Sequence, residues 1–258
     1  MSKSIIDQIF DHLRTIKQRS ESSLKRNDWP AYRQAVADYG ALRHECMTPV
    51  TEVHRVDVEG IPCEWLVPSN ATEDARLLYI HGGAWMAGGL ASHRGLASRI
   101  AEASGIPTLT LDYRLAPENP FPAGLEDCLS IYGWMLENGP HRSDPCGRAF
   151  IAGDSAGGNL TLASLLALKE LPEIMPDAAV VLSPATNFNA SGGSCESRRD
   201  RDPVIDHGRS AGFRKLYYPG HKPQEPLISP LYGDLTGLPP LLIQVGDAET
   251  LLDDSIHF

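Results

Sequence analysis

The fold is decided by one short stretch, Arg148-Ala-Phe-Ile-Ala-Gly-Asp-Ser-Ala-Gly157. Its first five residues are mostly apolar and predict a buried strand. A run rich in leucine and alanine follows and predicts a helix, so Gly153-Asp-Ser-Ala-Gly157 forms a sharp turn between the strand and the helix. This G-x-S-x-G pattern, in that setting, predicts that the turn lifts Ser155 out of the sheet as a nucleophile.

A second glycine-containing segment, His81-Gly-Gly-Ala-Trp85, directly follows the apolar run from Leu77 to Ile80. Glycines let a backbone approach a substrate oxygen without obstruction by a side chain. We therefore expect the N–H groups of Gly82 and Gly83 to bind an oxyanion formed at the serine, together with the N–H of Ala156 at the start of the following helix.

The first and last residues of this segment, His81 and Trp85, also allow predictions. His81 lies at the root of the loop, where a histidine is expected to brace the loop by hydrogen bonds to the backbone rather than to act as a base. Trp85 has two interpretations, a wall of an acyl pocket or a part of the core, and both stay open at this point.

The rest of the chain alternates short apolar runs with helical segments, which is typical of a mostly parallel sheet with helices on both faces, the α/β class. Residues 51–67 precede this pattern and predict an antiparallel hairpin around Glu59-Gly60. The first fifty residues predict two amphipathic helices. The segment 187–226 predicts an insertion that is helical around residues 208–218, and Pro240 to Val245 predicts the last strand. We expect one domain, 1–258.

The composition excludes several classes of partner and compartment. The chain has 23 basic and 33 acidic residues, a net charge of −10, which disfavours binding to nucleic acid or to an anionic membrane surface. Five scattered cysteines without a C-x-x-C pair indicate reduced thiols and a cytoplasmic location, since disulfides belong to oxidising compartments. The sequence shows neither a signal peptide nor an apolar run of about 18 residues that would span a membrane.

Three motifs at matching spacing give the chain a family resemblance: His81-Gly-Gly-Ala-Trp85, Asp112-Tyr-Arg-Leu-Ala-Pro-Glu118 and Gly153-Asp-Ser-Ala-Gly-Gly158. With them the chain resembles the hormone-sensitive-lipase family of bacterial carboxylesterases, from about residue 50 to its end. The resemblance implies an α/β-hydrolase fold with a helical cap, here residues 1–45 and 187–226. It also implies hydrolysis of short to medium acyl esters or lactones by a Ser, Asp or Glu, His triad without a cofactor. The middle motif is structural in that family, and we expect Arg114 and Glu118 to pair across its turn.

The resemblance also locates the acid of the triad. In the family, an acid stands six residues before the serine of an Asp-Asp-Ser run, and that position is Glu249 here; Asp247 is the alternative. The base should be a histidine after this acid, and only His257 follows. It falls in a predicted helix that leaves the site, about 12 Å along at 1.5 Å per residue, so it is a poor base. We expect a C-terminal truncation of about 40 to 50 residues relative to the family.

Two functions follow as hypotheses. The first is a carboxylesterase that acts on a small-molecule ester, impaired by the loss of the histidine segment. The alternative is a non-catalytic protein on the same scaffold that binds a small molecule. No metal or cofactor motif is visible. The apolar strand at 240–245 predicts an exposed sheet edge through which the chain could form a homo-oligomer.

Overall fold

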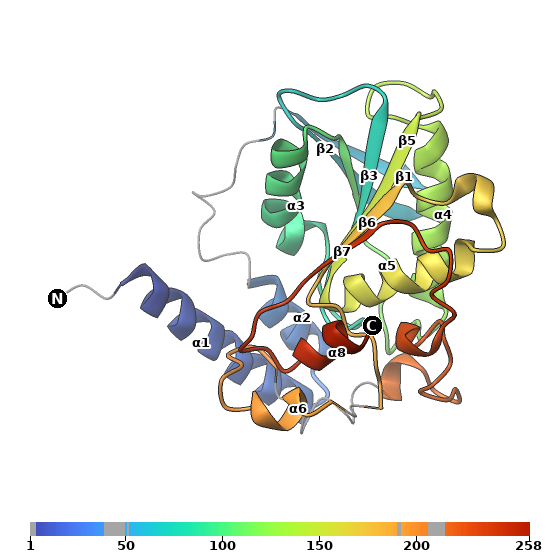
Figure 1. Ribbon diagram of the computed structural model, residues 1–258. Coiled ribbons are helices and arrows are strands. Elements are labelled where there is room, and N and C mark those ends of the chain that lie inside the picture. Colours follow the sequence, from blue (N-terminus) through green and yellow to red (C-terminus); the bar gives the residue numbers. More distant parts are fainter. Residues whose placement is uncertain (1–3, 39–49, 51, 190–191, 206–214) are drawn as a thin grey trace.

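The computed structural model describes residues 4–38, 50, 52–189, 192–205 and 215–258 (Figure 1). Within them, a seven-stranded sheet runs in the order β1-β2-β4-β3-β5-β6-β7. β3 to β7 are parallel to one another, whereas β2 runs antiparallel to both β1 and β4, so that β1 and β2 form a hairpin at one edge. The strands are β1 Glu52–Val58, β2 Ile61–Val67, β3 Ala75–Ile80, β4 Thr108–Leu111, β5 Arg148–Asp154, β6 Ala178–Leu182 and β7 Leu241–Gln244.

The predicted hairpin is confirmed, and the reason for it is local. Glu59 and Gly60 both have positive φ angles, 55° and 86°, and a two-residue turn of this kind matches the twist of the strands that it joins. β7 lies at the other end of the sheet, where the sequence predicts an exposed edge, and Leu242 on it is 59% exposed.

Helices cover both faces of the sheet, as the alternation of the sequence predicts (Figure 1). Neighbouring strand residues point to opposite faces. On β3, Leu77 and Tyr79 pack with Ala97 and Ala101 of α3. Leu78 and Ile80 point to the opposite face and join the larger cluster with α4 and α5. The main helices are α1 Ile5–Lys25, α2 Trp29–Ala37, α3 Leu90–Ser104, α4 Ala123–Glu137, α5 Ser155–Leu168, α6 Ser194–Ser197 and α8 Leu252–His257.

The two N-terminal amphipathic helices are also confirmed. Ile16 of α1 is buried, while Ile6 near the start of this helix is 61% exposed. The Lys17 ammonium donates to the backbone carbonyls of Asp202 and Ile205, which lie in the inserted segment 187–226. Segments far apart in the sequence, the N-terminal helices and the insertion, therefore lie against one another.

The predicted helix around residues 208–218 can be followed only in part. Residues 215–217 are helical, and residues 206–214 lie outside the described residues. Of the described cysteines, Cys63, Cys128 and Cys146 are free thiols. Among the described helices, none combines the length and the apolar character that a membrane span requires.

Candidate active site

The strand-to-helix turn is built as the sequence predicts. β5 ends at Asp154 and α5 begins at Ser155, whose φ of 52° lies in the left-handed region that is strained for a residue with a side chain. A Cβ atom on Gly157 would lie only 2.1 Å from the carbonyl oxygen of Ile80, so this position accepts only glycine. The close approach of α5 to the end of β3 brings the turn beside the segment that begins at His81.

The predicted oxyanion donors need one correction. The Gly82 N–H donates to Asp154 Oδ1 at 3.0 Å, so this group is already engaged and is not available to a substrate. The sequence pattern identified the correct loop but could not show that a carboxylate next to Ser155 takes its first N–H.

The next two N–H groups of the same loop are better placed for the role. In the described part of the chain, no acceptor is found for the N–H of Gly83 or of Ala84. Gly83 has a φ of 128°, and a Cβ there would lie 2.0 Å from the Ala87 carbonyl oxygen, so the loop requires glycine at this point. Ala156 lies in the first turn of α5, where backbone N–H groups have no acceptor within the helix. The helix dipole adds partial positive charge at that end.

Asp154 links the turn at Ser155 to the loop that begins at His81. Its Oδ1 accepts from the Tyr79 hydroxyl at 2.7 Å as well as from Gly82, and its Oδ2 lies 3.5 Å from His93 Nε2. Burial opposes ionisation of Asp154, but the neighbouring His93 and the two hydrogen-bond donors outweigh it and lower the pKa of this carboxyl. Asp154 is therefore charged, and its hydrogen bonds hold the Tyr79 side chain and the Gly82 backbone in place.

We expect Asp154→Ala to destabilise the fold, because it leaves the buried Tyr79 hydroxyl and the Gly82 N–H without their acceptor. Each orphaned buried donor costs about 1–3 kcal/mol of the free energy of unfolding. Urea unfolding would measure the loss. Asp200→Ala, at an exposed position, is the control and should change the free energy of unfolding by less than about 0.5 kcal/mol. Equal effects of the two substitutions would contradict the bracing role.

His81 is a structural residue in this arrangement, as the sequence indicates. It is 3% exposed and stacks on Tyr113, with ring centroids 4.3 Å apart. Its Nδ1 lies 2.7 Å from the carbonyl oxygen of Gly82, which accepts the bond. Burial, with a smaller contribution from His93, lowers the pKa of His81 to about 3, so this imidazole is neutral and holds the loop.

Trp85 is only 4% exposed and packs in an aromatic layer. Its ring stacks on Tyr217 and lies against Phe188, each at a centroid distance of 4.8 Å. Its indole N–H donates to Asn159 Oδ1 at 3.2 Å. Of the two interpretations of this residue, the structure supports the packed one.

The expected pair of Arg114 with Glu118 is wrong. The Arg114 side chain instead binds Asp127 of α4 with an Nε–Oδ1 distance of 2.9 Å. Glu118 pairs with Arg33 of α2, whose two terminal nitrogens reach both carboxylate oxygens, at 3.1 and 2.6 Å. Arg33 also donates to the carbonyl oxygens of Met86 and Ala116, so one side chain ties the N-terminal helices to two motifs of the main domain.

The acid-bearing segment, which carries Asp247 and Glu249, follows β7. Because β5, β6 and β7 are parallel, this segment and Ser155 both lie at the carboxyl ends of the strands. Glu249 is half-buried, and its Oε1 accepts from the Gly246 N–H at 2.7 Å. Asp247 instead pairs with Arg198 and Arg201 at 3.1 Å each, and these hydrogen bonds hold the pKa of its carboxyl below the usual value. Both carboxylate oxygens of Asp247 are thus already bound by arginine side chains.

The insertion holds this acid-bearing segment in place. The buried carboxylate of Asp202 accepts from both the N–H and the hydroxyl of Thr250, at 2.9 and 2.8 Å. The Ser194 hydroxyl donates to the Thr250 carbonyl oxygen at 2.9 Å. Because Thr250 is adjacent to Glu249, the insertion fixes the backbone from which the predicted acid projects. The sequence did not reveal this role of Asp202, since its partner lies 48 residues away.

His257 lies on an exposed side of α8, eight residues beyond Glu249. It makes no hydrogen bond with Ser155 or Glu249, and no other histidine of the described residues does so. The structure therefore brings together Ser155, the loop that begins at His81 and the first turn of α5, and none of the described histidines bonds to Ser155.

This geometry agrees with the comparisons with known proteins. The model of a family described by the alpha/beta hydrolase fold matches residues 77–258. The chain belongs to this α/β-hydrolase family. Its structure is similar to that of an esterase from the bacterial hormone-sensitive lipase family, with a TM-score of 0.85 and 39% identity. The superposition covers 100% of this chain and 83% of the esterase chain. The predicted family and fold are thereby confirmed.

Two curated α/β-hydrolase relatives extend the comparison. The chain is 44% identical over 201 residues to an acetyl-hydrolase of Streptomyces hygroscopicus, an alignment that covers 78% of this chain and 65% of that protein. It is 34% identical over 211 residues to an esterase of Acinetobacter venetianus, with coverages of 81% and 68%. The chain thus spans about two thirds of the length of these relatives.

Proposed function

We propose that the chain is a carboxylic ester hydrolase that acts on short to medium acyl esters or lactones through an acyl-enzyme on Ser155. The observation that carries the proposal is the strained Ser155 at the start of α5, beside a loop whose Gly83 and Ala84 N–H groups have no acceptor in the described part of the chain. Relatives named as an acetyl-hydrolase and esterases support the reaction class.

In the proposed mechanism, the Ser155 hydroxyl attacks the ester carbonyl and passes its proton to an imidazole that Glu249 orients. This imidazole would come from a C-terminal histidine segment like that of the hormone-sensitive-lipase family, because no described histidine bonds to Ser155 or Glu249. The N–H groups of Gly83, Ala84 and Ala156 hold the oxyanion of the tetrahedral intermediate. The imidazole then protonates the departing alcohol, and water repeats the sequence to release the acid. Ala84 replaces Gly82 as a donor because Asp154 occupies the Gly82 N–H.

The assignment of the acid can be tested in a chain extended with the C-terminal histidine segment of a hormone-sensitive-lipase relative. Glu249→Gln should lower turnover by about 10⁴-fold, as loss of the orienting carboxylate does in other triads. Asp247→Asn is the matched control and should have little effect, because Arg198 and Arg201 already bind that carboxylate. A ranking in the opposite order would transfer the role to Asp247.

The N-terminal helices (residues 1–45) and the insertion (187–226) form a cap over the substrate site in this proposal, on one α/β-hydrolase domain. Support comes from the bonds of Lys17 to the carbonyls of Asp202 and Ile205, which join the two segments. The link from Asp202 to Thr250 then connects the cap to the acid-bearing segment. Substrate selection would therefore depend on residues from two segments that are far apart in the sequence.

The partner that this function requires is a small-molecule ester. The free thiols of Cys63, Cys128 and Cys146 suit a reducing compartment, so we place the proposed activity in the cytoplasm. The exposed Leu242 on the edge strand β7 favours pairing with a second copy through that edge.

A second candidate function is non-catalytic binding of a small molecule. It is favoured by the lack of an imidazole bonded to Ser155 among the described residues. Hydrolysis of a chromogenic acetate or butyrate ester by the chain extended with the family's C-terminal histidine segment separates the two candidates, since only the hydrolase then releases the chromophore in proportion to enzyme and time. Tight binding of an ester analogue without any release would support the binder.

A further inference from the structure

Three potential metal ligands meet at the sheet edge formed by β1. Glu52 and His54 are two residues apart on this strand and so point to the same face. His141 reaches them from the segment between α4 and β5. One ligand atom from each residue lies within 4.8 Å of the others. His54 Nε2 is 2.5 Å from Glu52 Oε2, His141 Nε2 is 3.9 Å from the same oxygen, and the two imidazole rings meet edge to face at 5.1 Å.

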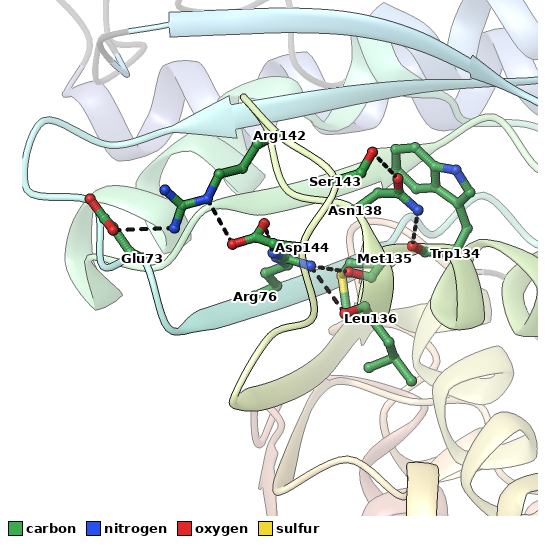
Figure 2. Close-up of polar contacts among 9 residues, drawn as sticks. All are labelled: Glu73, Arg76, Trp134, Met135, Leu136, Asn138, Arg142, Ser143 and Asp144. Carbon is green, nitrogen blue, oxygen red and sulfur yellow. Dashed lines mark hydrogen bonds and ion pairs between the residues drawn. The ribbon is translucent and has the colours of Figure 1, made fainter.

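The segment that carries His141 is firmly held. The Gly139 N–H donates to the Arg142 carbonyl oxygen at 2.8 Å, and the Ser143 hydroxyl donates to Asn138 Oδ1 at 2.8 Å. Figure 2 shows how Arg76 fixes the segment from below, through bonds to the Met135 and Leu136 carbonyls and to Asp144. The position of His141 is thus set by the fold, without help from Glu52 or His54.

The positive charge next to the cluster is also neutralised. Arg142 directly follows His141, and its guanidinium lies between Asp144, at 2.7 Å, and Glu73, at 3.3 Å (Figure 2). The guanidinium is therefore engaged by two carboxylates. It does not cancel the attraction of Glu52 for a cation.

We propose that Glu52, His54 and His141 form a binding site for a divalent transition metal ion, with Zn²⁺ as the best match. Two imidazole nitrogens and one carboxylate oxygen are a ligand set that Zn²⁺ accepts, with water in the fourth position. Tetrahedral bonds of about 2.0–2.1 Å place ligand atoms about 3.3 Å apart, and the present separations of 2.5 and 3.9 Å bracket this value. The side chains are 40–54% exposed, so small rotations suffice.

This site is separate from the nucleophile. Glu52 pairs with Val67 at the end of β2, and the neighbouring Leu66 pairs with Thr108 at the start of β4. The cluster therefore lies at the amino ends of the parallel strands, whereas Ser155 follows the carboxyl end of β5. A bound ion would join the edge strand β1 to the segment before β5 and would stabilise the fold rather than take part in hydrolysis.

Calorimetric titration of the tag-free, chelator-treated protein with ZnCl₂ in mildly alkaline buffer tests the site, since ligation needs neutral imidazole. We expect one ion per chain. Glu52→Gln, His54→Ala and His141→Ala should each weaken binding by at least about 10- to 100-fold, the loss already seen for outer-shell partners. His221→Ala is the matched control, because His221 and Glu225 form an exposed pair, at 2.9 Å, that the described residues do not complete with a third ligand.

Two further readouts do not depend on activity. Zn²⁺ should raise the thermal midpoint of the wild-type protein, because it binds the folded state, and should not do so for His141→Ala. Co²⁺ should give the visible absorption bands of a four-coordinate ion. The proposal is overturned if the wild-type protein takes up no ion in any of these measurements. It is equally overturned if uptake is unchanged by the three ligand substitutions, or falls as much with His221→Ala.

Discussion

Replacement of Ser155 by alanine is expected to abolish covalent labelling by an activated phosphonate. In a chain supplied with the family's C-terminal histidine segment, the same substitution should lower ester turnover by about 10⁶-fold, the loss seen when the serine of a triad is removed. The reason is that no other described serine begins a helix at a strand-to-helix turn beside the unpaired N–H groups of Gly83 and Ala84.

Ser183→Ala is the matched control for this experiment. Ser183 follows β6, the neighbour of β5, and its φ of 47° resembles that of Ser155, but it begins no helix. It should keep full labelling and turnover. Labelling that survives Ser155→Ala would remove the nucleophile assignment, and loss in Ser183→Ala alone would move it to that serine.

The second large effect concerns the general base. The 258 residues by themselves should hydrolyse esters about 10⁶-fold more slowly than the same chain extended with a family-like segment that carries the histidine. A neutral serine hydroxyl is a weak nucleophile, so only positioning and the oxyanion donors would contribute, about 10³- to 10⁴-fold over water. Turnover of a chromogenic acetate ester by the two forms measures the difference.

His257 decides the interpretation of that comparison. His257→Ala should leave the slow rate of the 258 residues unchanged, because this side chain lies on an exposed side of α8 without a bond to Glu249. Turnover of about 1–10 s⁻¹ by the unextended chain, typical of an intact enzyme, together with its loss in His257→Ala, would make His257 the base.

Much of the fold could be predicted from the sequence because its signals are local. Alternation of apolar residues marks strands and hairpins, and Glu59-Gly60 fixes the turn between β1 and β2 by backbone preference alone. The turn at Ser155 is predictable for the same reason, since the small residues that flank it reflect the contact of Gly157 with Ile80. The predicted boundaries of the strands and helices agree with the observed ones within a few residues.

The errors arose where a side chain has several partners within reach. Arg114 and Glu118 are near in sequence, yet Asp127 and Arg33 outcompete this local pairing through contacts that only the folded chain provides. The bond from the Gly82 N–H to Asp154 was not predictable, because it spans 72 residues. The cluster of Glu52, His54 and His141 was invisible for the same reason, since two of its members lie 87 positions apart.

The contacts of Arg33 have a consequence for protein engineering. Its guanidinium holds the Met86 carbonyl of the oxyanion loop and the Glu118 carboxylate together with α2. An exchange of N-terminal helices between relatives, made to alter substrate choice, would therefore also alter the support of the oxyanion loop. A chimera keeps these contacts only if the incoming helix carries an arginine at this position and the recipient keeps Glu118.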